Sequence, residues 1–162
     1  MIGIVLHEPE QPGNAGAIGR TCVCAGASLH LIEPLGFHLT DRYVKRAGMD
    51  YWERLDVTRY MDYESFLEAH QNAKIWYLTT KAVQCYTEVS YGPDDFLMFG
   101  KESGGIPEEI LKAHPERCIR IPMKPDERSL NLATSAAIVV FEALRQCGFP
   151  GMDRKGHFPD ES

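Results

Sequence analysis

The sequence contains no apolar run that approaches the roughly 18 residues a membrane-crossing helix needs. Its first residues, MIGIVLHEPEQPGN, have no basic segment and soon become acidic, so we expect no signal peptide and a cytoplasmic protein. With 162 residues, 44% apolar and 25% charged, the composition is typical of one soluble globular domain. We expect this domain to span residues 1–150, followed by a polar tail at 151–162.

The spacing of a metal site is also missing. The five cysteines are scattered, and Cys22 and Cys24 share a predicted helix, where side chains two positions apart point in different directions. The six histidines show no ligand spacing either. We therefore expect no bound metal.

Two common nucleotide-binding loops are absent. The stretch LMFGKESGGIP, residues 97–107, is rich in glycine, but its lysine follows the first glycine, whereas a phosphate-binding G-x-x-x-x-G-K-[ST] loop places it after the last. Gly100, Gly104 and Gly105 do not fit the dinucleotide pattern G-x-G-x-x-G. A nicotinamide-dependent oxidoreductase is disfavoured, and the stretch indicates a bend where backbone approaches some other ligand.

Positive charge is in short supply. A formal net charge of −6 argues against indiscriminate binding of nucleic acids, because phosphate contacts need basic groups. A local patch is compatible with this charge, since residues 42–59 include Arg42, Lys45 and Arg46 among several acidic residues. By itself, this stretch is either a solvated surface or an RNA-binding patch.

What the chain does have is a regular alternation of strand and helix patterns. It predicts an α/β domain with a mainly parallel sheet, helices on both faces, and ligands beyond the carboxyl ends of the strands. Several apolar runs are nearly continuous, as in strands covered on both faces. The predicted strands are 2–6, 29–34, 54–60, 74–80, 95–100 and 118–123, and the predicted helices are 14–26, 41–48, 62–70, 107–113 and 129–146.

Three predicted strand ends gather unusual residues. They are LTTK at 78–81, FGKESGGIP at 99–107 and IPMKPDERSLNLA at 121–133. In a parallel sheet these ends can meet at one crevice, where free backbone groups suit a purine and a ribose. Leu78, Ile121 and Met123 would provide apolar surface for an adenine. The alternative is that the three segments are ordinary turns.

The stretch 129–146 is apolar nearly all round until Glu142, which predicts a helix buried on most sides. It is either a central core helix or a subunit interface. Asn131 within it needs polar partners, so it braces the preceding loop or a ligand. Near the start of the chain, Asn14 is the predicted N-cap of the first helix. Arg20 should lie two turns further, beside the same edge of the sheet, as a surface residue or as a group that holds a phosphate or carboxylate.

Together, NAGAIGR (14–20), FGKESGGIP (99–107) and SLNLATSAAIVVFEALRQ (129–146) resemble the SPOUT family of knotted RNA methyltransferases. The resemblance covers essentially the whole chain. It is sharpest for the minimal single-domain branch called TrmL or YibK, because EPEQPGNAGAIGRTC, LIEPLGF, RAGMDYW, LTTK, IPM and SLNLA occur in the order typical of that branch. The resemblance implies a SPOUT α/β-knot, with a deep trefoil knot in the C-terminal half.

It also implies S-adenosylmethionine as the cofactor, held in the knotted loops, with no metal. The cofactor-binding positions carried over from the family are Leu78, Thr79, Gly100, Glu102, Gly105, Ile106, Ile121, Met123, Ser129 and Leu130. Arg20 and Asn131 are the implied catalytic residues. Because a guanidinium stays protonated in proteins, we expect Arg20 to position a phosphate or ribose rather than to act as a general base.

The implied reaction is methyl transfer to the ribose 2′-hydroxyl of the wobble nucleotide of tRNA, a cytidine or a modified uridine. Family members are generally homodimers, which would place the last helix at the interface and combine two patches of Arg42, Lys45 and Arg46 for RNA binding. Phe141 stands where some relatives carry tyrosine, so any role of that hydroxyl is absent. Two alternatives remain: 2′-O-methylation of another tRNA or ribosomal RNA position, and a non-catalytic RNA-binding module that keeps the cofactor pocket.

Overall fold

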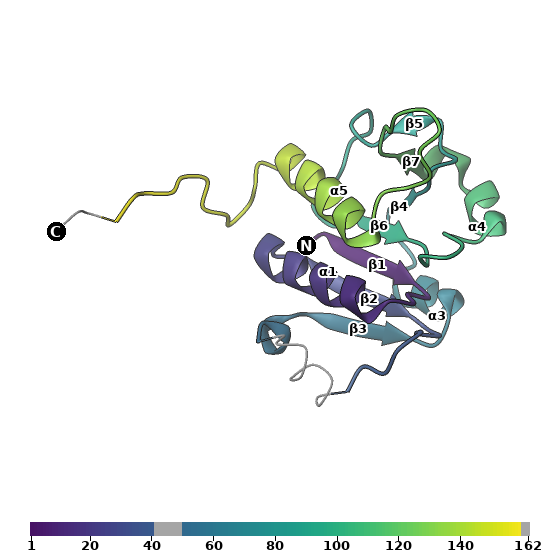
Figure 1. Ribbon diagram of the computed structural model, residues 1–162, viewed down its shortest axis with the longest axis horizontal. Coiled ribbons are helices and arrows are strands. Elements are labelled where there is room, and N and C mark those ends of the chain that lie inside the picture. The colour runs from purple at the N-terminus through teal and green to yellow at the C-terminus, as the bar shows by residue number, and fades with distance from the viewer. Residues whose placement is uncertain (41–49, 160–162) are drawn as a thin grey trace.

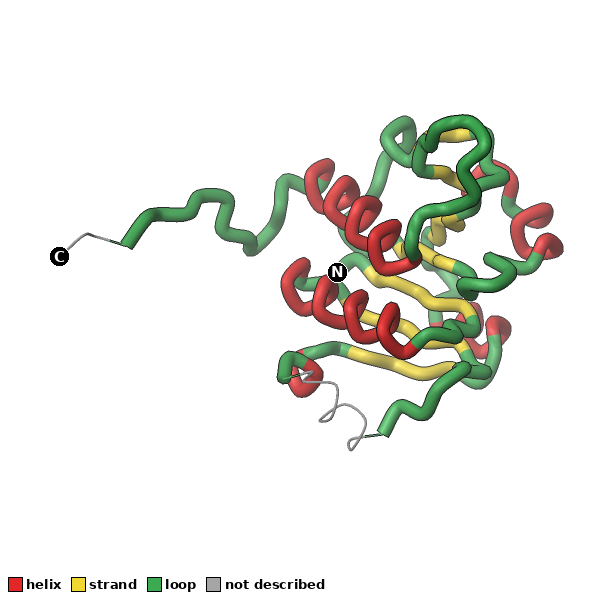
Figure 2. Tube along the Cα trace, viewed as in Figure 1, coloured by secondary structure: helices red, strands yellow, loops and turns green. Residues whose placement is uncertain are grey.

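The computed structural model describes residues 1–40 and 50–159 and contains a seven-stranded sheet in which neighbouring strands all run parallel (Figures 1 and 2). The prediction of a parallel α/β sheet is thereby confirmed. The strand order is β3-β2-β1-β6-β4-β7-β5. The strands are β1 Gly3–His7, β2 Ser28–Ile32, β3 Val57–Tyr60, β4 Ile75–Leu78, β5 Gln84–Cys85, β6 Phe96–Phe99 and β7 Cys118–Arg120.

Helices cover both faces of this sheet, also as predicted. On one face, α1 (Pro12–Ala25) and α5 (Leu132–Gln146) lie side by side (Figure 1). The other face carries α3 (Tyr63–Ala69) and α4 (Glu108–Ala113), and two short 3₁₀ helices are η1 (Trp52–Arg54) and η2 (Pro115–Arg117). Successive strand residues point to opposite faces, so Ile4 and Leu6 join the core under α1 and α5 while Val5 joins the one under α3 and α4.

Several predicted boundaries shift. The first strand runs one residue later than predicted, and the last strand ends at Arg120 rather than 123, because Pro122 has no N–H to donate to a neighbouring strand. The two-residue strand β5 was not predicted, since it forms only where its chain meets β7. The last helix begins at Leu132 rather than Ser129: Asn131 is its N-cap and lies at its start, not inside it.

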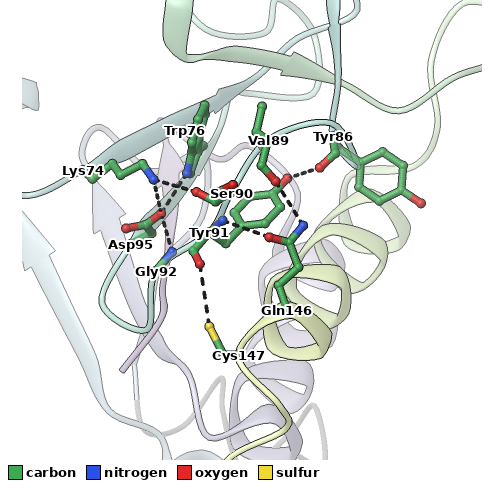
Figure 3. A network of polar contacts seen from close by, with 10 residues as sticks. All are labelled: Lys74, Trp76, Tyr86, Val89, Ser90, Tyr91, Gly92, Asp95, Gln146 and Cys147. Atoms are coloured by element: carbon green, nitrogen blue, oxygen red, sulfur yellow. Dashed lines mark hydrogen bonds and ion pairs between the residues drawn. The ribbon is translucent and has the colours of Figure 1, made fainter.

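The far end of α5 is tied to the segment between β5 and β6 (Figure 3). The Gln146 side chain accepts a hydrogen bond from the Tyr91 N–H at 3.0 Å and donates one to the Val89 carbonyl at 3.0 Å. At the same place the buried Asp95 carboxylate accepts a hydrogen bond from the Trp76 indole at 2.9 Å. These bonds fix the long connection that crosses from β5 back to β6, and they hold α5 against it.

Within this single chain, α5 is buried along one face rather than on most sides. Ala136, Val139 and Val140 are fully buried, whereas Phe141 remains 38% exposed on the outer side. No helix in the described part of the chain is both long and apolar enough to span a membrane. Residues 153–159 are exposed, have no regular secondary structure and extend away from the domain (Figure 2).

Two predictions fall outside the described residues. The predicted helix 41–48 and the patch of Arg42, Lys45 and Arg46 both lie in 41–49. The trefoil knot also stays a prediction. The topology is compatible with it, because β7, which follows β6 in sequence, inserts between β4 and β5.

Candidate functional site

The carboxyl ends of β4, β6 and β7 open into one cavity of about 640 Å³, as the sequence predicted. The cavity is lined by 78–81 at the end of β4, 99–106 at the end of β6, Leu111 of α4, Arg120, Ile121 and Met123 at the end of β7, and 128–132 with Ser135 at the start of α5. All ten predicted cofactor-binding residues lie on its wall: Leu78, Thr79, Gly100, Glu102, Gly105, Ile106, Ile121, Met123, Ser129 and Leu130. Asn131 lines it as well, as do Gln11 and Asn14 at the start of α1.

The bend after β6 explains its glycines. The Gly105 N–H donates to the Lys101 carbonyl at 2.8 Å, and Gly105 has φ +69°, a conformation that glycine adopts without strain. At Gly100 a Cβ would lie 2.0 Å from the carbonyl carbon of Gly105 and 2.1 Å from the nitrogen of Ile106. A side chain there is incompatible with this turn, so main chain instead of side chain forms this part of the cavity wall.

A polar relay joins all three segments that carried the family resemblance. The Glu102 carboxylate accepts hydrogen bonds from the Glu10 N–H at 2.8 Å, the Gln11 N–H at 3.0 Å and the Asn14 side-chain amide at 3.1 Å. The Asn14 amide oxygen in turn accepts from the Asn131 side chain at 3.0 Å. The relay therefore links the bend after β6 to the start of α1 and the start of α5.

The relay also explains how α1 begins. Asn14 was predicted as its N-cap, and that was wrong: the helix starts at Pro12, an imino acid preferred in the first turn. The N-cap residue Gln11 offers no side-chain cap, and the first turn holds no acidic residue. Glu102 supplies the missing anion from another segment, next to the positive end of the helix dipole. Asn14 is free to join Glu102 to Asn131, a role that sequence reasoning missed.

A second set of contacts locks the same two loops together. The Glu10 carboxylate accepts from the Ser103 N–H at 2.9 Å and from the Ser103 hydroxyl at 2.7 Å, and these two bonds lower the pKa of Glu10. Lys101 Nζ lies 3.3 Å from a carboxylate oxygen of Glu8. Glu102 thus binds the backbone before α1 while Glu10 binds the backbone after Glu102, in a reciprocal clasp. Sequence reasoning did not predict this clasp.

Arg20 lies on the surface, which is one of the two alternatives that the sequence left open, and its catalytic role stays a prediction. It is exposed on α1 and is not among the residues that line the cavity. Six residues after Asn14, a helix has turned by about 600° and advanced by about 9 Å, so the two side chains point in different directions. Arg20 lies near Tyr51. Burial raises the pKa of the Tyr51 hydroxyl, and the positive charge of Arg20 acts in the opposite direction, lowering that pKa. Asn131, by contrast, lies directly on the cavity wall.

The cavity wall is chemically suited to S-adenosylmethionine. Leu78, Ile106, Ile121 and Met123 give apolar surface for an adenine face, and the strand ends offer backbone N–H and C=O groups for the base edge and the ribose hydroxyls. A volume of about 640 Å³ lies within the range usual for cofactor sites.

Three comparisons with known proteins bear on this site. The family model described as the SpoU rRNA methylase family matches residues 1–141. The tRNA (cytidine(34)-2'-O)-methyltransferase of Escherichia coli (strain K12) is 51% identical over 152 residues, which cover 93% of this chain and 97% of that protein.

Solved structures give the same picture. One that concerns the 2-OH methylation of C/U34 on tRNA superposes with a TM-score of 0.85 and 40% identity, covering 91% of this chain and 97% of that one. An AdoMet-bound rRNA methyltransferase from Sinorhizobium meliloti has a TM-score of 0.77 and 27% identity, covering 89% of this chain and 56% of that one. The match therefore extends over nearly the whole of the present chain.

Proposed function

The chain belongs to the SpoU rRNA methylase family, and from this premise we propose that it methylates the ribose 2′-hydroxyl of the wobble nucleotide of tRNA, position 34, using S-adenosylmethionine. It is a methyltransferase. The observation that carries the proposal is the cavity at the ends of β4, β6 and β7, with the Glu102–Asn14–Asn131 relay across its wall. The likeness to the Escherichia coli enzyme supports the choice of nucleotide.

The cofactor would lie against Leu78, Ile121 and Met123, with the glycine-rich bend closing main chain around it. When bound, S-adenosylmethionine supplies an electrophilic methyl group on a sulfonium. The task of the protein is then to align the ribose oxygen with that methyl group and to let the hydroxyl proton leave. Asn131 faces the cavity and is held by Asn14, so its amide is preorganised to orient cofactor or ribose.

Arg20 would act on the RNA side of the reaction. Its guanidinium remains protonated, so its role is to hold a phosphate or the ribose rather than to accept the proton. Because Arg20 lies outside the cavity of its own chain, this role fits a homodimer in which the second protomer completes the RNA site. Sedimentation equilibrium should give twice the mass of the 18.3 kDa chain.

The direct test is methyl transfer from S-adenosylmethionine to tRNA taken from cells that lack the endogenous enzyme, with the product nucleoside mapped by mass spectrometry. A 2′-O-methylated wobble nucleotide would confirm the proposal. Methylation at another position would keep the chemistry and change the target. No transfer to competent tRNA, with intact cofactor binding, would favour a different RNA or a binding-only role.

Arg20→Ala separates the two halves of the site. We expect transfer to fall by at least about 100-fold, a loss typical of a residue that acts on the transition state, while the cofactor Kd measured by calorimetry stays within about twofold. Equal loss of both would mean that Arg20 supports the cofactor cavity instead.

A further inference from the structure

The rim of the cavity is positively charged although the chain as a whole is acidic. Among the residues that line the cavity, four side chains are cationic and one is a carboxylate, in a protein of formal net charge −6. The carboxylate, Glu102, is already engaged by three hydrogen bonds from the start of α1. A cleft with a local excess of one charge attracts ligands of the opposite charge.

Two of the four cations are neutralised by neighbours, and two are not. Lys81 pairs with Glu108, and Lys101 pairs with Glu8. Arg120 and Arg128 make no side-chain hydrogen bond or ion pair with any residue in 1–40 or 50–159. Arg128 is exposed and Arg120 is half-buried. Both residues line the cavity, and each carries a planar guanidinium suited to bidentate binding of an oxyanion.

The cofactor does not account for this charge. S-adenosylmethionine carries a sulfonium, an ammonium and one carboxylate, so its net charge is positive and two unpaired arginines gain little from it. The RNA backbone carries one negative charge per phosphate, including those on both sides of the target ribose. When one nucleotide of an RNA enters the cavity, the phosphates on its two sides must lie at the rim.

We propose that Arg120 and Arg128 bind the tRNA phosphates that flank the methylated nucleotide. The inference rests on the proposed function and extends it to the residues that position the substrate. Arg120 is the last residue of β7 and Arg128 lies in the loop between β7 and α5, and both line the cavity together with Asn131. Phosphate contacts from this wall fix the position of the ribose without reading the base. They are separate from the predicted patch of Arg42, Lys45 and Arg46.

The test uses the full-length protein and the variants Arg128→Ala, Arg128→Lys and Arg120→Ala. The KM for tRNA is measured at several salt concentrations with saturating cofactor, and the Kd for S-adenosylmethionine is measured by calorimetry. Lys112→Ala is the control, because Lys112 is an exposed cation on α4 that does not line the cavity. Circular dichroism melts confirm that each variant folds, and the exposed Arg128 carries the test if Arg120→Ala does not fold.

We expect Arg128→Ala to raise the KM for tRNA about tenfold, as expected for one lost hydrogen bond to a charged group. The slope of log KM against log salt should fall by roughly one. The cofactor Kd should stay within about twofold. Arg128→Lys should restore the salt slope, because it keeps the charge, but only part of the affinity, because it lacks the bidentate guanidinium. Lys112→Ala should match the wild type in both KM and slope.

Two outcomes would overturn the proposal while leaving the proposed function intact. A weaker cofactor Kd with an unchanged salt slope would assign the arginines to the carboxylate of the cofactor. The second outcome is a wild-type protein that methylates tRNA and an Arg128→Ala variant with the same KM for tRNA at every salt concentration. This result would show that the rim does not contact phosphates. Failure of the wild type to methylate any tRNA would refute the proposed function itself.

Discussion

Replacing Glu102 by glutamine tests whether one carboxylate holds the three segments of the site together. The change keeps the size and shape of the side chain but turns one acceptor oxygen into an amide donor. Of the two carboxylate oxygens, one accepts the Glu10 N–H and the other accepts both the Gln11 N–H and the Asn14 amide. A glutamine has only one acceptor oxygen, so its NH₂ group must face at least one of the N–H groups that now donate to Glu102.

Rotating the Asn14 amide cannot remove this mismatch without breaking another hydrogen bond of the relay. If Asn14 rotated its amide to offer an oxygen to the introduced glutamine, it would turn its NH₂ group toward the Asn131 amide that now donates to it at 3.0 Å. The loss is one or two charge-assisted hydrogen bonds in a half-buried place, plus the anion at the start of α1. Because partial exposure weakens each bond, we expect a total of about 2 kcal/mol, or a fall in Tm of roughly 4–8 °C for a chain of this size.

Urea denaturation followed by circular dichroism measures the stability, and calorimetry measures the Kd for S-adenosylmethionine. We expect the cofactor to bind about tenfold more weakly, because the bend that closes on it loses its anchor. Glu109→Gln is the matched control: Glu109 is exposed on α4, away from the cavity, and should change stability by less than about 0.5 kcal/mol. If Glu102→Gln unfolds at the wild-type urea concentration and binds the cofactor as tightly, the relay has no energetic role.

Two further predictions follow from single positions. Gly100→Ala should lower cofactor affinity at least about tenfold by calorimetry, because its Cβ would lie 2.0 Å from backbone, whereas Gly104→Ala should be tolerated, since the nearest atom, 3.3 Å away, belongs to the flexible Lys101 side chain. Burial lowers the pKa of His30 from 6.5 to about 4; below pH 6.5 the unfolded chain therefore takes up a proton that the folded chain does not. The free energy of unfolding should decline by about 3 kcal/mol as pH falls from 6.5 to 4. Urea unfolding of a His30→Gln variant tests this: if its free energy of unfolding falls as steeply with pH as that of the wild type, His30 is not the cause.

The local pattern of the sequence was enough to predict the architecture. Continuous apolar runs at Ile75–Leu78 and Phe96–Phe99 required strands covered on both faces, and their alternation with helices required a parallel sheet. A parallel sheet brings its carboxyl ends to one edge, so the three glycine-rich or polar loops had to meet there. The ten predicted wall residues, whose assignment rested on the family resemblance, all lie on the cavity for this reason.

Local reasoning was wrong where a distant segment decides the structure. Asn14 has the chemistry of an N-cap, but its partner is Glu102, 88 residues away, so it joins a relay instead. Strand β5 has only two residues and exists because β7 lies beside it. For Arg20 the sequence left a surface residue and an anion-holding group open, and only the fold shows that it is exposed on α1 and does not line the cavity.

Apart from β5, the sequence by itself determined which segments become strands, helices and bends, because those choices depend on the spacing of apolar residues and on glycine and proline at particular positions. Only the tertiary structure decided which polar groups satisfy one another. Asn14 is separated from Glu102 and Asn131 by 88 and 117 residues along the chain, and no local pattern encodes their distances of about 3 Å. The same holds for Arg120 and Arg128, which become notable only because the fold places them on the wall of a cavity and leaves them unpaired among the described residues.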